Sequence, residues 1–137
     1  MPKTILTHLD DKYRVTIPRE LREAIGLKRG SSLLLSLDES RRVVFLTPIE
    51  NPQNLYSMRI VLKDRPGALA EAAKRLADFG VDIFLSESRT LSRGSLAEWS
   101  LLIDLSGLKI SQKEFVKGIS HPPVLEVYLE PLRWEEF

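Results

Sequence analysis

Basic residues surround one predicted strand-to-helix junction in the stretch KYRVTIPRELREAIGLKRG, residues 12–30. They are Lys12, Arg14, Arg19 and Arg22. The first two lie two positions apart and would share one face of a strand, while the last two lie about one helical turn apart. Arginine pairs with phosphate and can fork onto a guanine edge, so this corner has the chemistry to hold a DNA backbone. The alternative is ordinary surface chemistry, with helical pairs such as Arg19–Glu23.

A second candidate lies in LKDRPGALAEAAKRLADFGVDI, where Gly67 follows Pro66 in a loop before a predicted helix. Glycine allows a ligand to approach the backbone closely, and the free N–H groups of a helix start suit a small carboxylate. The alternative is a simple turn glycine.

Other chemistry has little support in the 137 residues. There is no cysteine, which excludes disulfides, thiolate catalysis and Cys-ligated zinc. His8 and His121 have no further ligands at metal spacing, and neither a phosphate-binding glycine loop nor a nucleophile–base pair is present. We therefore expect a protein that is not an enzyme and has no catalytic residues, cofactor or metal. No apolar run reaches about 18 residues and no signal peptide is evident, so we expect a cytoplasmic protein without a membrane partner.

The stretch PIENPQNLYS, residues 48–57, marks a domain boundary because its two prolines favour extended or turn conformations. We predict a first domain over 1–48, a linker over 49–56 and a second domain over 57–137. Residues 1–50 carry nine Lys and Arg against seven Asp and Glu, a mild positive balance that permits nucleic-acid binding.

The first domain is predicted to consist of short strands around a single helix. Alternating residues predict strands over 4–9 and 14–18, the spacing of Leu21, Ala24 and Ile25 predicts a helix that stops at Gly26, and apolar runs predict strands over 31–37 and 41–47. These few short elements would bury too little apolar surface for the domain to be stable alone. We therefore expect this half to dimerise.

The second domain has the element order β-α-β-β-α-β. The predicted strands cover residues 57–63, 81–91, 97–105 and 124–132, and the predicted helices cover 68–80 and 111–119. This order is typical of the ferredoxin-like fold, with two helices on one face of an antiparallel sheet. The fold class is therefore α+β.

Nearly all of residues 4–48 resembles the AbrB/SpoVT family of swapped-hairpin DNA-binding domains, which includes MazE-type antitoxins; the match is carried by V-T-I-P followed by R-E-L-R-E-A-I-G-L. The resemblance implies a small β-barrel made by two interleaved chains, with DNA contacts from Lys12, Arg14 and Arg22. Tyr13 stands where the family often has glycine, and Glu23 stands where some members are basic. Arg19 would partly compensate for Glu23.

Residues 57–131 resemble an ACT domain, a regulatory module that commonly binds amino acids between paired domains; D-R-P-G-A-L and F-G-V-D-I carry this match. The resemblance implies ligand contacts from the loop before the first helix and from the start of the second strand. The matching positions are Asp64, Gly67, Ala68, Leu69, Asp82 and Ile83.

These features favour a DNA-binding transcriptional regulator, a homodimer or higher homo-oligomer whose binding to double-stranded DNA is modulated by a small ligand, an amino acid by resemblance. The main alternative is a protein-interaction module, the regulatory subunit of a metabolic enzyme, that does not bind DNA. An antitoxin is less favoured because a folded domain, in place of a disordered toxin-wrapping tail, follows residue 57.

Overall fold

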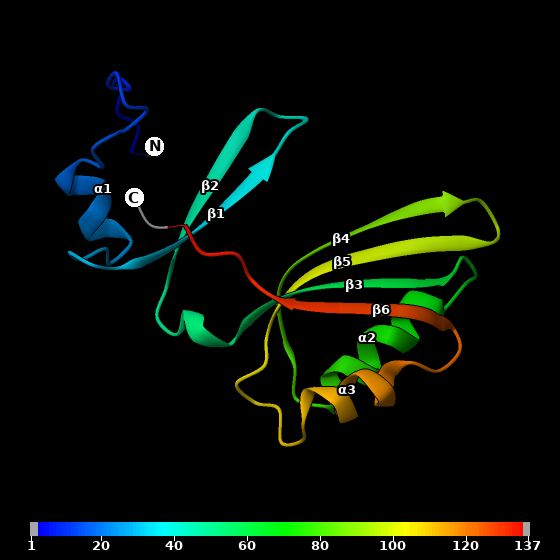
Figure 1. Ribbon diagram of the computed structural model, residues 1–137. Coiled ribbons are helices and arrows are strands. Elements are labelled where there is room, and N and C mark those ends of the chain that lie inside the picture. Colours follow the sequence, from blue (N-terminus) through cyan, green and yellow to red (C-terminus); the bar gives the residue numbers. More distant parts are fainter. Residues whose placement is uncertain (1–2, 136–137) are drawn as a thin grey trace. The chain divides into compact units, whose positions relative to one another are not determined.

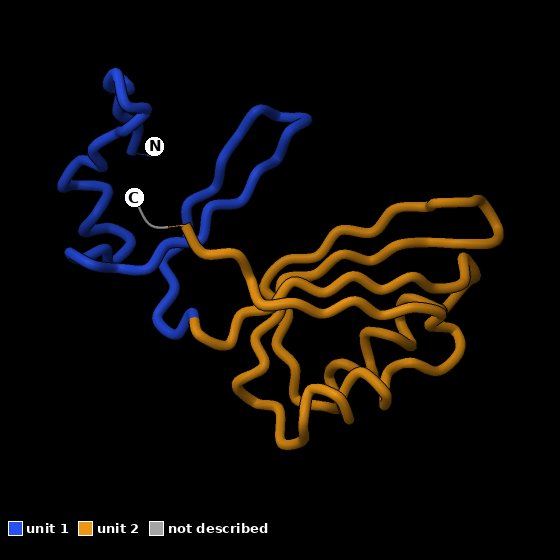
Figure 2. The backbone as a smooth tube through the Cα atoms, viewed as in Figure 1, with its two compact units in different colours: residues 1–52 blue, residues 53–137 orange. Residues whose placement is uncertain are grey.

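The computed structural model describes residues 3–135, and the chain divides into two compact units, Met1–Pro52 and Gln53–Phe137 (Figure 2). The division falls inside the stretch 49–56, where a short 3-10 helix, η1 (Pro52–Asn54), lies between two strands. Within the described residues, no helix is both long and apolar enough to cross a membrane.

The first unit contains the helix α1 (Arg19–Ala24) and an antiparallel hairpin of β1 (Ser32–Asp38) and β2 (Val43–Ile49). Gly26 ends the helix with a φ of +73°, a left-handed conformation that glycine adopts without strain. The Leu27 N–H then donates to the Arg22 carbonyl at 2.9 Å, and the Gly26 N–H donates to the Glu23 carbonyl at 3.3 Å. This pair of bonds satisfies carbonyls that the helix end would otherwise leave free.

The strands predicted over 4–9 and 14–18 are wrong for the single chain, because neither segment forms a strand in the structure. Their alternating pattern suits a half-buried strand, but a strand also needs a neighbour to receive its hydrogen bonds. Within the described residues β1 and β2 pair with each other, and neither segment pairs with the outer edge of this hairpin. The segments flank a turn, closed by a hydrogen bond from Asp10 N to Arg14 O at 2.9 Å.

The β1–β2 hairpin carries an entirely apolar face, because residues directly opposite each other in an antiparallel pair lie on the same side. The pairs on this side are Leu33–Pro48, Leu35–Leu46 and Leu37–Val44. Leu35 and Leu37 are 65% and 70% exposed, and no residue between 3 and 52 is buried. Residues 3–52 of the first unit therefore form no core of their own within one chain.

The second unit is a four-stranded antiparallel sheet with two helices on one face (Figure 1). In chain order its elements are β3 (Leu55–Lys63), α2 (Ala68–Asp78), β4 (Asp82–Ser92), β5 (Leu96–Asp104), α3 (Gln112–Ile119) and β6 (Val124–Pro131). The strands lie in the order β4-β5-β3-β6. The ferredoxin-like fold predicted for this half is confirmed, and the whole chain is α+β.

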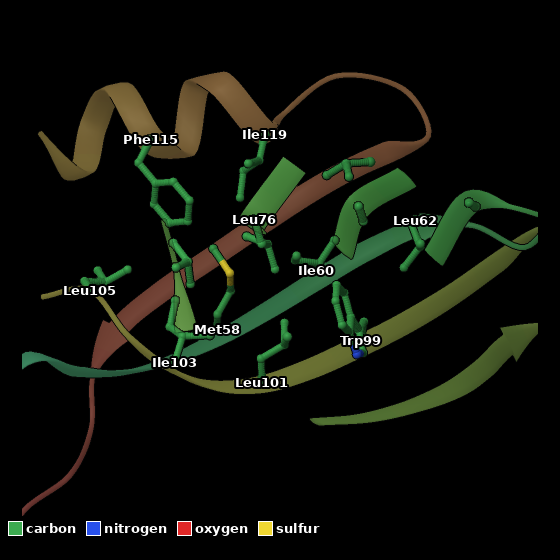
Figure 3. Packing of buried hydrophobic residues seen from close by; sticks show 14 residues of the cluster. Met58, Ile60, Leu62, Leu76, Trp99, Leu101, Ile103, Leu105, Phe115 and Ile119 are labelled. Atoms are coloured by element: carbon green, nitrogen blue, oxygen red, sulfur yellow. The ribbon is translucent and has the colours of Figure 1, made fainter. Parts of the chain in front are cut away.

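The core of the second unit lies between the helices and the two central strands (Figure 3). Met58, Ile60 and Leu62 alternate along β3, so all three project toward the helices. Leu76 of α2 and Phe115 of α3 meet them, and both are fully buried. This unit folds around its own apolar side chains, in contrast to the first.

Phe79, which directly follows α2, contacts Phe115 and Gly118 of α3. The two rings pack edge to face, with centroids 5.5 Å apart and planes at 81°. A Cβ atom built on Gly118 would lie 2.5 Å from the Phe79 ring, so a side chain at this position would displace that ring. The glycine is the residue that lets α3 approach α2.

Gly118→Ala tests this contact. Alanine in a helix normally gains about 1 kcal/mol over glycine, but overpacking costs about 1–3 kcal/mol. We expect a net loss of stability and a lower urea midpoint, measured by tryptophan fluorescence. Lys117→Ala, at an exposed position of the same helix, is the control and should leave the midpoint unchanged. A Gly118→Ala protein as stable as the wild type would contradict the close approach.

Candidate functional site

One carboxylate organises the turn that carries Lys12 and Arg14. Asp10 Oδ1 accepts hydrogen bonds from the backbone N–H groups of Lys12 (2.8 Å) and Arg14 (2.9 Å). Its second oxygen, Oδ2, accepts a hydrogen bond from Arg14 Nε at 2.8 Å. A short aspartate that bonds to its own following backbone is a common way to fix a turn. Asp10 therefore holds residues 10–14 in one conformation.

The bonds from Arg14 also stabilise the charged form of Asp10. They hold the pKa of the Asp10 carboxyl below its ordinary value of 3.8, the backbone N–H of Arg14 first and its guanidinium second. The positive charge of Arg14 is in turn partly offset by this carboxylate. Arg14 thus stabilises the turn, in addition to any contact that it makes with a partner.

The basic residues of α1 divide into one that is paired and one that is not. Arg19 Nε donates to Glu23 Oε1 at 2.8 Å across one helical turn. This is the surface ion pair that the sequence analysis gave as the alternative to DNA contact. Arg22, like Lys12, forms no ion pair with any residue that the structure describes. Of the four residues predicted to bind DNA, Arg22 and Lys12 are therefore the two whose charge is not offset by a carboxylate of the described chain.

A hollow of about 430 Å³ lies beside α1. Its apolar lining comes from Ile17, Leu27 and Leu33. Its polar lining comes from Arg19, Arg22, Glu23, Lys28, Arg29, Gly30 and Ser31. The hollow thus gathers four cations against one carboxylate, a balance that favours an anionic partner.

Lys28 and Arg29 are members of this basic set that the sequence reasoning missed. Their signal was the run GLKRG, two cations between two glycines, Gly26 and Gly30, both of which adopt positive φ. The segment between these glycines brings the two cations back toward α1. Residue spacing along a helix or strand does not predict this return.

Conversely, Lys12 and Arg14 do not line the hollow. Their predicted common strand face is wrong for the single chain, since they lie in and beside a turn.

In the second unit, Asp64 is used to hold two loops together. Its Oδ2 accepts a hydrogen bond from Gly94 N at 2.7 Å, and its own N–H donates to Ser95 O at 3.0 Å. These bonds fasten the loop before α2 to the turn between β4 and β5. Gly67 directly precedes α2 with a φ of +82°, so the conformation there requires glycine.

The structure divides the six predicted ligand residues into two groups. Asp64, Gly67, Ala68 and Leu69 lie at the start of α2, where Ala68 is buried and Leu69 is 41% exposed. Asp82 and Ile83 lie beyond the other end of α2, where Asp82 pairs with Asp104 of β5. Because an 11-residue helix is about 16 Å long, a small ligand cannot touch both groups of one chain. A ligand that contacts both must lie between two copies.

No group of three or more His, Cys, Asp or Glu residues in the described part of the chain is arranged to hold a metal ion.

Comparison with known families gives one match, to "Antidote-toxin recognition MazE, bacterial antitoxin", over residues 9–54. The matched segment is about a third of the chain and holds the Asp10 turn, α1 and the β1–β2 hairpin. The first unit is thus similar to the MazE family in the part that carries the basic residues. The search of curated proteins gave no match.

Solved structures similar to this chain include three with low sequence identity. An unknown protein from Galdieria sulphuraria has a TM-score of 0.49 and 13% identity over 61% of this chain and 47% of its own. The ACT domain of GTP pyrophosphokinase from Chlorobium tepidum has a TM-score of 0.44 and 16% identity over 56% and 96%. The regulatory subunit of aspartate kinase from Thermus thermophilus has a TM-score of 0.46 and 14% identity over 58% and 52%. This chain thus spans about half the length of the first and third proteins.

The Asp10 turn predicts a specific pH dependence. The pKa of Asp10 in the folded chain, measured by NMR titration of its carboxyl carbon, should lie below 3.8. The turn is then stabilised above pH 3.8, and the stabilisation is lost as the pH falls through the lower, folded value. Arg14→Gln removes the guanidinium but keeps the backbone bond, so it should raise this pKa only part of the way. An Asp10 pKa at or above 3.8 in the wild type would contradict the assignment.

Proposed function

We propose that the protein is a transcriptional regulator that binds double-stranded DNA as a homodimer or higher homo-oligomer. The observation that carries the proposal is the gathering of cations on the first unit. Arg22, Lys28 and Arg29 line one hollow beside α1, and Lys12 and Arg14 lie on a turn that Asp10 fixes. The similarity of residues 9–54 to the MazE family supports the same role.

The unpaired cations act on the phosphates of the DNA. Each lysine or arginine that neutralises a phosphate releases a condensed counterion, so affinity falls as salt rises. A fixed turn loses less conformational entropy on binding than a mobile one. The entropy cost of binding DNA through Lys12 and Arg14 is therefore lower. A dimer would present the set twice, as a symmetric pair of half-sites.

The second unit would supply regulation. We assign Asp64, Gly67, Ala68, Leu69, Asp82 and Ile83 to a small amino-acid effector held between two copies, because one chain separates these residues into two groups. The loop of one copy and the β4 start of another would then complete one site. An effector that binds one arrangement of the copies more tightly would shift the population toward it and change the DNA affinity.

A second function, a protein-interaction module acting as the regulatory subunit of a metabolic enzyme, is favoured by two observations. Arg14 and Arg19 are already paired with carboxylates of their own chain, and the apolar hairpin face suits protein association. Salt separates the two functions, because phosphate-dominated binding weakens steeply with salt and apolar association does not.

The test is binding of the full chain to a pool of labelled genomic fragments across a salt series, with and without mixed amino acids. We expect steep salt dependence, an amino-acid-dependent shift in affinity, and a salt slope that falls by about 1 in Arg22→Ala. Arg93→Ala, an exposed arginine of the second unit, is the control and should behave as wild type. Absence of binding at low salt would overturn the DNA function, and binding without the shift would overturn the effector alone.

A further inference from the structure

Tyr13 is held in a conformation that its side chain disfavours. Its φ is +61°, in the left-handed region that glycine occupies freely and bulky residues rarely do. The three hydrogen bonds to the Asp10 carboxylate, together with one from Tyr13 N to Asp10 O at 3.2 Å, impose this turn. A residue strained in this way persists only because its surroundings determine it, and such residues cluster at functional sites.

The strain at Tyr13 is not offset by burial. The residue is 87% exposed, so its ring removes almost no apolar surface from water in the single chain. A glycine or asparagine would take the same φ with less strain. The side chain is therefore presented outward at a cost to the fold, and the gain must come from a partner.

The neighbours of Tyr13 indicate what that partner is. Lys12, with no ion pair in the described chain, precedes it, and Arg14, fixed by Asp10, follows it. Because Tyr13 lies between two cations in the sequence, a phosphate-rich partner that the cations attract would come close to its exposed ring, and a tyrosine hydroxyl is a common donor to phosphate oxygens.

We propose that Tyr13 contacts DNA, with its hydroxyl donating a hydrogen bond to a backbone phosphate next to those held by Lys12 and Arg14. This inference rests on the proposed DNA-binding function. It makes the turn a three-residue clamp, in which two members carry charge and the middle member is neutral. Because a neutral donor releases no counterion, Tyr13 contributes affinity that does not depend on salt.

The test compares Tyr13→Phe and Tyr13→Gly with wild type in DNA binding across a salt series. Loss of one hydrogen bond should weaken binding of Tyr13→Phe by about 3-fold to 10-fold, with the salt slope unchanged. Tyr13→Gly should bind still more weakly, although its melting temperature is equal to or above that of the wild type, because glycine relieves the strain. Tyr128→Phe, the same deletion in the second unit, is the control and should leave binding unchanged.

The outcomes separate this inference from the proposed function. If Arg22→Ala lowers the salt slope of a wild type that binds DNA while Tyr13→Phe binds as tightly as wild type, the hydroxyl assignment is overturned and the function stands. If the wild type does not bind DNA, both fail. If Tyr13→Gly loses affinity because it no longer dimerises, as seen by sedimentation, Tyr13 belongs to the subunit interface and the proposal is overturned.

Discussion

The first unit depends on apolar surface that a single chain cannot bury. One whole face of its hairpin is leucine, valine and proline, and no residue from 3 to 52 is buried. Burying a leucine is worth about 1.5–3 kcal/mol, so covering this face is the main source of stability still available to the unit. The second unit has a complete core of its own. The apolar surface that a second copy would cover therefore lies in the half of the chain that carries the predicted DNA-binding residues.

A second copy would link the two candidate sites. Pairing of two first units would double the cations of the turn and of α1, and symmetry would repeat them at a fixed spacing. The residues that we assign to an effector in the second unit are separated by α2 within one chain and would also need a second copy to meet. Under the proposed function, dimerisation would be the common condition of DNA binding and of effector binding. A bound effector and a bound DNA would each favour a particular arrangement of the same pair, which is the basis of linkage between sites.

The sequence predicted the second unit well because its fold is determined by local periodicity and by its own core. Alternation on β3 and the helical stripe of α2 placed these elements within two residues of their observed bounds. The prediction failed over 4–9 and 14–18, since alternation indicates which face is buried but not whether a neighbouring strand exists. The hydrogen bond from Gly94 to Asp64 could not be predicted from local sequence patterns either, because it joins residues 30 positions apart. The role of Asp10 and the return of Lys28 and Arg29 toward α1 depend on turn geometry, which residue spacing does not encode.

Burial of Leu35 by a second copy tests the central claim most directly. The chain contains no cysteine, so Leu35→Cys introduces a single thiol on the apolar hairpin face, and its rate of modification by a thiol reagent reports its exposure. Ser40→Cys, in the exposed turn of the same hairpin, is the reference. We predict that the Leu35→Cys thiol is modified much more slowly than the reference at high protein concentration and approaches it on dilution. Equal rates for the two thiols at every concentration would contradict the account.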